Sequence, residues 1–114
     1  MEGFMRVVRQ GFIPFGGFGA INLFGVLFVR REMRLTPVVM NHEEIHTAQM
    51  RELGYLFFYL AYVAEWLFRL VTYRFDAMRA YRAISFEREA YARQEDLRYL
   101  ERRRRFAMWR FHNN

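Results

Sequence analysis

Two histidines stand four residues apart in a segment that carries the signals for both ends of a helix. From Thr36 to Gly54 the chain reads "TPVVMNHEEIHTAQMRELG". Thr36 is a good N-terminal cap, and Pro37 suits the first helical position because the N–H that it lacks has no partner there. Gly54 favours an end about two residues earlier. Positions i and i+4 of a helix project side by side, so His42 and His46 are expected on one face.

Strand-forming residues precede this helix. The stretches "RVVR" (6–9) and "AINLFGVLFVR" (20–30) are rich in Val, Ile and Phe, and "PFGGFG" (14–19) between them supplies turn residues. They predict a two-stranded antiparallel unit, with Gly25 as a possible bulge in the second strand.

Two further helices are predicted after Gly54. Residues 55–74 are apolar nearly all round, and a third helix is expected over residues 78–104. The predicted fold is therefore α+β, with an N-terminal β-hairpin followed by three mainly antiparallel helices. A chain of 114 residues without an evident linker is expected to form one domain, residues 1–114.

Composition restricts the chemistry and the surface. The chain has no cysteine, so disulfides and thiolate metal sites are excluded and a cytoplasmic location is expected. All 18 basic residues are arginine, and the net charge of +6 is concentrated in a basic tail, about 98–114. This tail is expected to be a solvated helix end or a surface for an anionic membrane. Nucleic acid is a weak option because no recognised binding signature accompanies the arginines.

Two uncharged stretches are candidates for membrane contact. Residues 10–29 contain five glycines and a proline, which argue against a spanning helix. A secretory signal is not expected either, because no small-residue cleavage site follows an apolar run. Residues 53–64 are too few to cross a bilayer, and Glu65 and Arg69 then interrupt the apolar run. Both charges would be costly near the centre of a span. Their four-residue spacing lets them pair, which reduces this cost, but a buried or interfacial helix is still expected rather than a span.

Residues 42–46, His-Glu-Glu-Ile-His, fit the H-E-x-x-H pattern. On a helix, both imidazoles can reach one Zn²⁺ at about 2.0–2.1 Å. Glu43 lies about 100° further round the helix, where it can hydrogen-bond a metal-bound water without ligating the metal. The pattern therefore predicts His42 and His46 as zinc ligands and Glu43 as a general base.

A catalytic zinc site needs a third protein ligand. Without cysteine a carboxylate is expected, and three glutamates compete. Glu65 follows His46 with 18 residues between, and Glu87 follows with 40 between. Glu89 is two residues later, and one helix presents at most one of Glu87 and Glu89 to a given metal.

The first motif, followed by "FEREAY" (86–91), resembles the gluzincin metallopeptidases, whose third zinc ligand is a glutamate on a later helix. The resemblance is greatest to the HtpX and CAAX-prenyl-protease group, the antibiotic-sensing signal-transducer peptidases and the stand-alone minimal gluzincin domains. It covers roughly residues 20–92. In the HtpX group the second motif reads E-x-x-A-D, which implies that Glu87 is the ligand and Glu89 an outer residue. Tyr91 stands where that family has an aspartate that steadies a zinc-binding histidine.

The resemblance also implies that the strand within residues 20–30 runs beside the active-site helix and binds an extended peptide by strand addition. A hairpin that merely caps the helices is the alternative. Asn41 and Thr47 flank the histidines and could orient them, but as surface polar residues they need no role. Candidates to stabilise a tetrahedral oxyanion are Tyr81, Tyr91 and His112.

Together these features predict a cytoplasmic zinc-dependent peptidase acting on a peptide or protein substrate, with attachment to the inner face of the cell membrane as an option. The alternative is a non-enzymatic, zinc-stabilised helical adaptor that binds a membrane surface or a protein partner.

Overall fold

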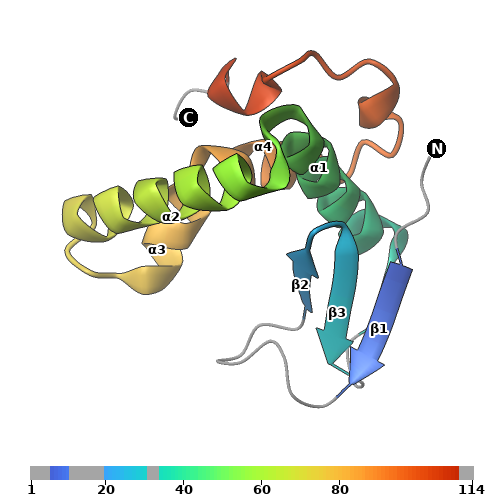
Figure 1. The fold of residues 1–114 in the computed structure, drawn as a ribbon, viewed down its shortest axis with the longest axis horizontal. Helices are drawn as coiled ribbons and strands as arrows, with labels where there is room; N and C mark the ends of the chain where they lie inside the picture. Colours follow the sequence, from blue (N-terminus) through green and yellow to red (C-terminus); the bar gives the residue numbers. More distant parts are fainter. Residues whose placement is uncertain (1–5, 11–19, 31–33, 111–114) are drawn as a thin grey trace.

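Three short strands begin the computed structural model, which describes residues 6–10, 20–30 and 34–110 (Figure 1). The strands are β1 (Arg6–Gln10), β2 (Ala20–Leu23) and β3 (Val26–Arg30), in the sheet order β1-β3-β2. The predicted α+β class, with a β-hairpin preceding the helices, is confirmed.

The hairpin lies within residues 20–30 and not between residues 6–9 and 20–30. β2 pairs with β3 antiparallel, with Leu23 opposite Val26, whereas β1 pairs with β3 parallel. The antiparallel pairing predicted for the first strand is therefore wrong. Phe24 and Gly25 both have positive φ, 55° and 86°, as a two-residue hairpin turn of the primed type requires. Gly25 is thus a turn residue and not a bulge. The turn predicted over 14–19 lies outside the described residues.

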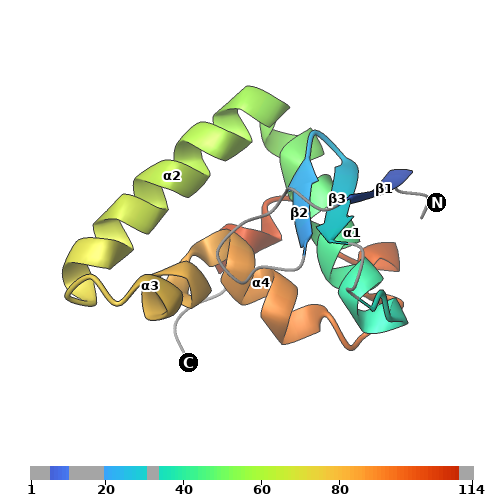
Figure 2. The same ribbon diagram turned by 90° about the horizontal axis from the view of Figure 1, so that it is seen from below.

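Four helices follow the sheet: α1 (Pro37–Leu53), α2 (Tyr55–Thr72), α3 (Ala77–Ala83) and α4 (Ser85–Arg93). Two short 3-10 helices, η1 (Tyr99–Glu101) and η2 (Ala107–Arg110), complete the described chain. The Thr36 hydroxyl accepts the Val39 N–H at 3.1 Å, as predicted for the cap of α1. Figure 2 shows α2 at one edge of the molecule, with α3 and α4 returning beside it toward α1.

The third predicted helix, 78–104, is broken at Ile84, whose ψ of 136° is extended. Glu65 of α2 explains the break. Its two carboxylate oxygens accept the N–H and the hydroxyl of Ser85 at 2.7 and 2.6 Å. The bond to the Ser85 N–H satisfies one of the free backbone donors in the first turn of α4, where a new helix begins. No Glu65–Arg69 ion pair, which the sequence suggested, is found in this described part of the chain.

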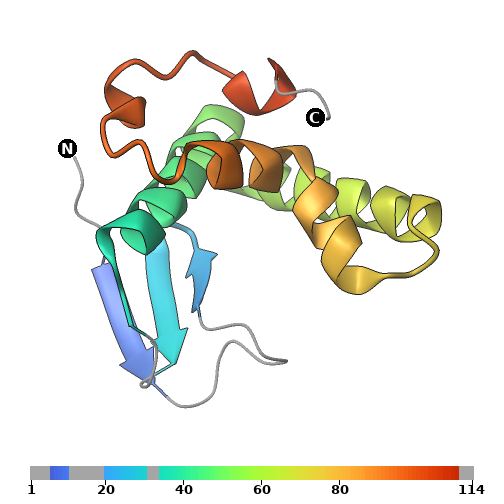
Figure 3. The same cartoon turned by 180° about the vertical axis from the view of Figure 1, so that it is seen from behind.

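The basic segment after α4 folds back instead of continuing as a solvated helix, and it places η2 against α4 (Figure 3). Arg103 is buried, with only 5% of its side chain exposed, and it pairs with Glu52 and Glu89. Met108 completes the main apolar core with Met50 and Phe86. Part of the basic tail therefore belongs to the interior.

α2 is the one helix, within the described ranges, that is long and apolar enough to cross a membrane by length and composition. Only Phe58 of its 18 residues is buried. The helix is therefore neither a core helix nor evenly covered by the rest of the fold.

Replacing Glu65 with alanine should lower the free energy of unfolding by about 1–3 kcal/mol, because a buried serine loses both bonds to a carboxylate. Glu101→Ala is the control, since Glu101 forms an exposed ion pair with Arg98 and should change stability by less than about 1 kcal/mol. Urea unfolding of both variants measures the difference. Equal stability of the two would contradict the role assigned to Glu65.

Candidate metal centre

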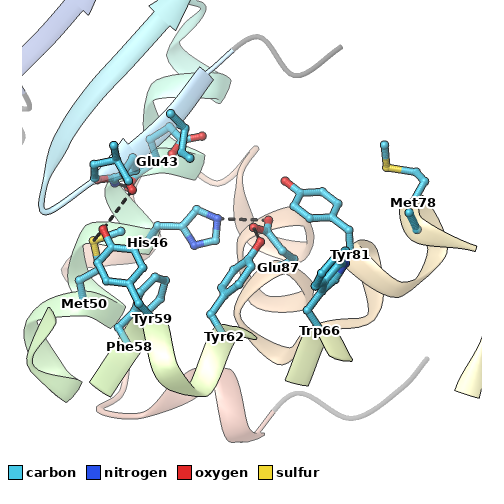
Figure 4. A pocket seen from close by; sticks show the side chains of 14 residues that line it. Glu43, His46, Met50, Phe58, Tyr59, Tyr62, Trp66, Met78, Tyr81 and Glu87 are labelled. Carbon is cyan, nitrogen blue, oxygen red and sulfur yellow. Dashed lines mark hydrogen bonds and ion pairs between the residues drawn. The ribbon is translucent and has the colours of Figure 1, made fainter. Parts of the chain in front are cut away.

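The two histidines of α1 and Glu87 of α4 converge on one point. His42 Nε2 and His46 Nε2 lie 3.2 Å apart, and Glu87 Oε1 lies 3.2 and 3.1 Å from them. All three residues are buried, with 6%, 5% and 3% exposure. Figure 4 shows His46 and Glu87 pointing toward each other across the gap between their helices.

The three side chains form a group that could hold a metal ion. Ligands at 2.0–2.1 Å around a tetrahedral ion lie about 3.3 Å from one another, which is close to the separations found here. The donors are two imidazole nitrogens and one carboxylate oxygen, a set that transition metals accept. The residues therefore fit a divalent ion in both spacing and chemistry.

Gln49, one turn after His46, fixes the orientation of that imidazole. Its Nε2 donates to the Phe86 carbonyl at 3.0 Å and to Glu89 at 2.9 Å. The remaining amide oxygen therefore faces His46 Nδ1, 2.8 Å away, and accepts its proton. The Nε2 atom of His46 is the nitrogen left for a metal.

Gln94 does the same for His42, whose Nδ1 lies 2.8 Å from the Gln94 amide oxygen. Asn41 holds Gln94 in place, because its side-chain amide donates to the backbone carbonyls of Gln94 at 2.8 Å and Asp96 at 3.0 Å. Asn41 was expected at the surface, but it is buried. From α1, its side-chain amide satisfies backbone carbonyls just after the C-terminal end of α4. Tyr91 does not bond His42 Nδ1; its ring packs edge-on against the His42 ring at 4.5 Å.

Glu87 is oriented by Tyr62 of α2. The Tyr62 hydroxyl donates to Glu87 Oε2 at 2.6 Å, which leaves Oε1 for the histidines. Sequence reasoning did not identify Tyr62, because a tyrosine in an aromatic helix carries no sign of its partner. Gln49 is three residues after His46 and so lies on the same face of α1, which could have indicated a contact with the histidine. No such spacing indicates Gln94.

The other candidate ligands lie elsewhere. The carboxylate of Glu65 is bonded to Ser85. The carboxylate of Glu89 is fully buried and accepts from Gln49, from Tyr99 at 2.7 Å and from Arg103. Glu89 is thus connected to His46 through Gln49 and is not one of the converging groups.

A cavity of about 600 Å³ opens beside this group. Edge strand β2 and all four helices line it, mostly with apolar and aromatic side chains, among them Leu23, Met50, Phe58, Trp66 and Met78. Its polar lining includes His46, Glu43 and Glu87. The cavity therefore joins an apolar space to the candidate metal position.

Glu43 reaches this cavity but is not one of the three converging groups. Burial raises the pKa of its carboxyl, while the nearby His46 and His42 lower it. The backbone of Glu43 is fixed to the sheet, since its carbonyl accepts the Asn22 side-chain amide at 3.0 Å. Asn22 also donates to Thr47 at 2.9 Å, so Thr47 is buried against β2 and not a surface residue as expected.

Of the candidate oxyanion stabilisers, Tyr81 lines the cavity. Its hydroxyl lies 3.4 Å from that of Tyr91, whose ring packs on His42. Burial raises the pKa of Tyr81, so its hydroxyl stays protonated and able to donate. His112 lies outside the described residues.

Comparison of the chain with protein-family models, curated proteins and solved structures found no match.

Without a bound metal ion, His46 carries an additional proton at neutral pH. Burial alone would lower the pKa of His46, but the Glu87 carboxylate raises it to about 9. Burial would raise the pKa of Glu87, but His46 and His42 hold it far below its usual range. His46 is therefore protonated and Glu87 ionised at neutral pH in the metal-free protein.

The metal-free protein should lose stability as the pH rises from about 6.5 to 9. The pKa of His46 is raised above its unfolded value, so its stabilising contribution is complete below about pH 6.5 and is lost through pH 9. Urea unfolding in the presence of a chelator at several pH values measures this slope. His46→Gln should remove it, and an equal slope in that variant would contradict the assignment.

Gln94→Ala should weaken metal binding about 10- to 100-fold, because His42 loses the acceptor that fixes its ring. Gln94→Glu should retain binding, since a carboxylate oxygen can accept the same proton. Competition with a fluorescent chelator measures both affinities, with circular dichroism to confirm the fold. The role of Gln94 would be refuted by an alanine variant that binds metal as tightly as the unaltered protein.

Proposed function

We propose that this protein is a zinc-dependent peptidase with His42, His46 and Glu87 as ligands and Glu43 as general base. Zn²⁺ suits two imidazoles and one carboxylate, and three protein ligands leave a fourth position open, as in catalytic zinc sites. The observation that carries the proposal is the place of Glu43. It follows a ligand directly, lines the cavity beside His46 and Glu87, and stands apart from the converging group.

When bound, the zinc ion would polarise a substrate carbonyl and acidify a coordinated water. Glu43 would accept a proton from a water that attacks the substrate carbonyl and would return it to the leaving amine. Burial raises the Glu43 pKa, which makes its carboxylate a stronger base. Tyr81 is the described candidate to donate a hydrogen bond to the developing oxyanion.

The cavity supports a peptide substrate with a bulky apolar side chain. Among the described strands, β2 pairs with β3 and leaves its other edge open, and its residues Ile21, Asn22 and Leu23 line the cavity. An extended peptide could add to this edge by backbone hydrogen bonds, with one side chain directed among the aromatic residues. We place the activity in the cytoplasm, at the inner face of a membrane.

One observation favours the non-enzymatic alternative. The candidate ligands join α1 to α4, and Tyr62 joins α2 to the same point, so a metal there would stabilise the fold without any catalysis. A zinc-stabilised adaptor would need the ligands but not Glu43.

Purified protein should contain one zinc ion per chain, and Glu87→Ala should reduce that content. Glu43→Gln should keep the zinc but lower peptide cleavage at least about 100-fold, because the base is removed. Glu44→Gln is the matched control, since Glu44 lies next to it on α1 and does not line the cavity. Mass spectrometry of a peptide library after digestion measures cleavage.

Cleavage by Glu43→Gln at the rate of the Glu44→Gln control would refute the general base. Zinc bound at one per chain without cleavage of any peptide would instead favour the adaptor. Zinc binding unaffected by Glu87→Ala would refute the third ligand.

A further inference from the structure

α2 presents a broad apolar surface to solvent. We name the α2 outer face by its residues: Leu56, Phe57, Leu60, Val63, Leu67, Phe68 and Val71. Their exposed fractions range from 51% to 70%. Figure 2 shows the sheet and the other helices on the opposite side of α2. No described element covers this face.

The α2 outer face is continuous. At 3.6 residues per turn, its members occupy an arc of about 140° around the helix, and the only other residue in that arc is Ala64. No polar side chain interrupts it. Exposed apolar surfaces of this extent mark contact with a membrane or a partner.

The opposite side of α2 fixes which face is exposed. Phe58 is buried in the main core, Tyr62 donates to Glu87, and Glu65 accepts from Ser85. Rotating α2 to cover its outer face would break all of these contacts. The same contacts would also be lost if α2 left the fold to span a bilayer alone.

Charge points to an anionic lipid surface. Exposed arginines bracket the helix, with Arg51 four residues before α2 begins and Arg74 two residues after it ends. The only acidic residue of α2 is Glu65, which lies on the inner side and is bonded to Ser85. Arginine forks bind phosphate well, and an apolar helix face with flanking basic residues is typical of helices that lie in the membrane interface.

A second copy of the chain fits this face less well. Paired helices use a narrow apolar seam flanked by charged positions that set the register. The α2 outer face is wider, and the residues next to it, Ala61, Leu70 and Thr72, carry no charge. A fluid bilayer needs no register.

We propose that α2 lies in the plane of a membrane that contains anionic phospholipid. The α2 outer face enters the boundary between headgroups and acyl chains, and Arg51 and Arg74 contact lipid phosphates. This proposal does not depend on the metal or on catalysis.

The test is flotation of the purified full chain with vesicles of phosphatidylcholine alone or mixed with phosphatidylglycerol. The protein should float with the mixed vesicles, and less at high salt. Leu60→Gln combined with Leu67→Gln should reduce flotation at least tenfold. Leu97→Gln is the matched control, because Leu97 is 55% exposed, as against 56% and 52% for Leu60 and Leu67, but lies beyond α4. This control should float like the unaltered protein.

Failure of the unaltered protein to float with mixed vesicles would overturn the proposal, as would flotation of the double variant at the unaltered level. So would a dimer that dissociates on the double substitution in the absence of lipid, since the partner would then be a second copy. Zinc content and peptide cleavage measured on the same variants separate this outcome from failure of the proposed function.

Discussion

The buried carboxylate of Glu87 is the point on which the described fold depends. An ionised carboxylate in the interior is costly unless its oxygens are paired, and here every partner comes from another helix. Oε1 faces the two histidines of α1, and Oε2 accepts the Tyr62 hydroxyl of α2. One side chain of α4 therefore links α4 to both α1 and α2. The same carboxylate gives the two histidines of α1 a charged partner in the interior. Histidines exposed on a surface helix would need no such partner.

Neutral amides support both histidines. Where a carboxylate holds an imidazole, it adds negative charge to the ligand and increases its basicity. Gln49 and Gln94 supply the same acceptor geometry without that charge. A bound cation would thus be balanced mainly by Glu87. Less negative charge around a metal makes it a stronger Lewis acid. The charge of Glu89 is neutralised by Arg103, and Glu89 is connected to His46 only through Gln49.

The sequence alone predicts those features that depend on residues close together in the chain. Thr36, Pro37 and Gly54 define α1, and the spacing of His42 and His46 follows from its turn. Glu87 required the resemblance of a second motif, because nothing local places it near α1. The hairpin turn at Phe24 and Gly25 was missed because a phenylalanine with positive φ is not a turn signal. The break at Ile84 was missed because a side chain from another helix, Glu65, produces it. Gln94 and Tyr62 act through contacts between distant segments, which one sequence does not reveal.

The buried ion pairs of Arg103 have a consequence for the order in which the chain can fold during synthesis. Arg103 joins Glu52 to Glu89, and Met108 closes the core beneath them. During synthesis the two histidines emerge from the ribosome well before these residues, so the nascent chain exposes imidazoles that have no fixed orientation. The three groups that could hold an ion would therefore take up the arrangement described here only once the chain has folded as far as Met108.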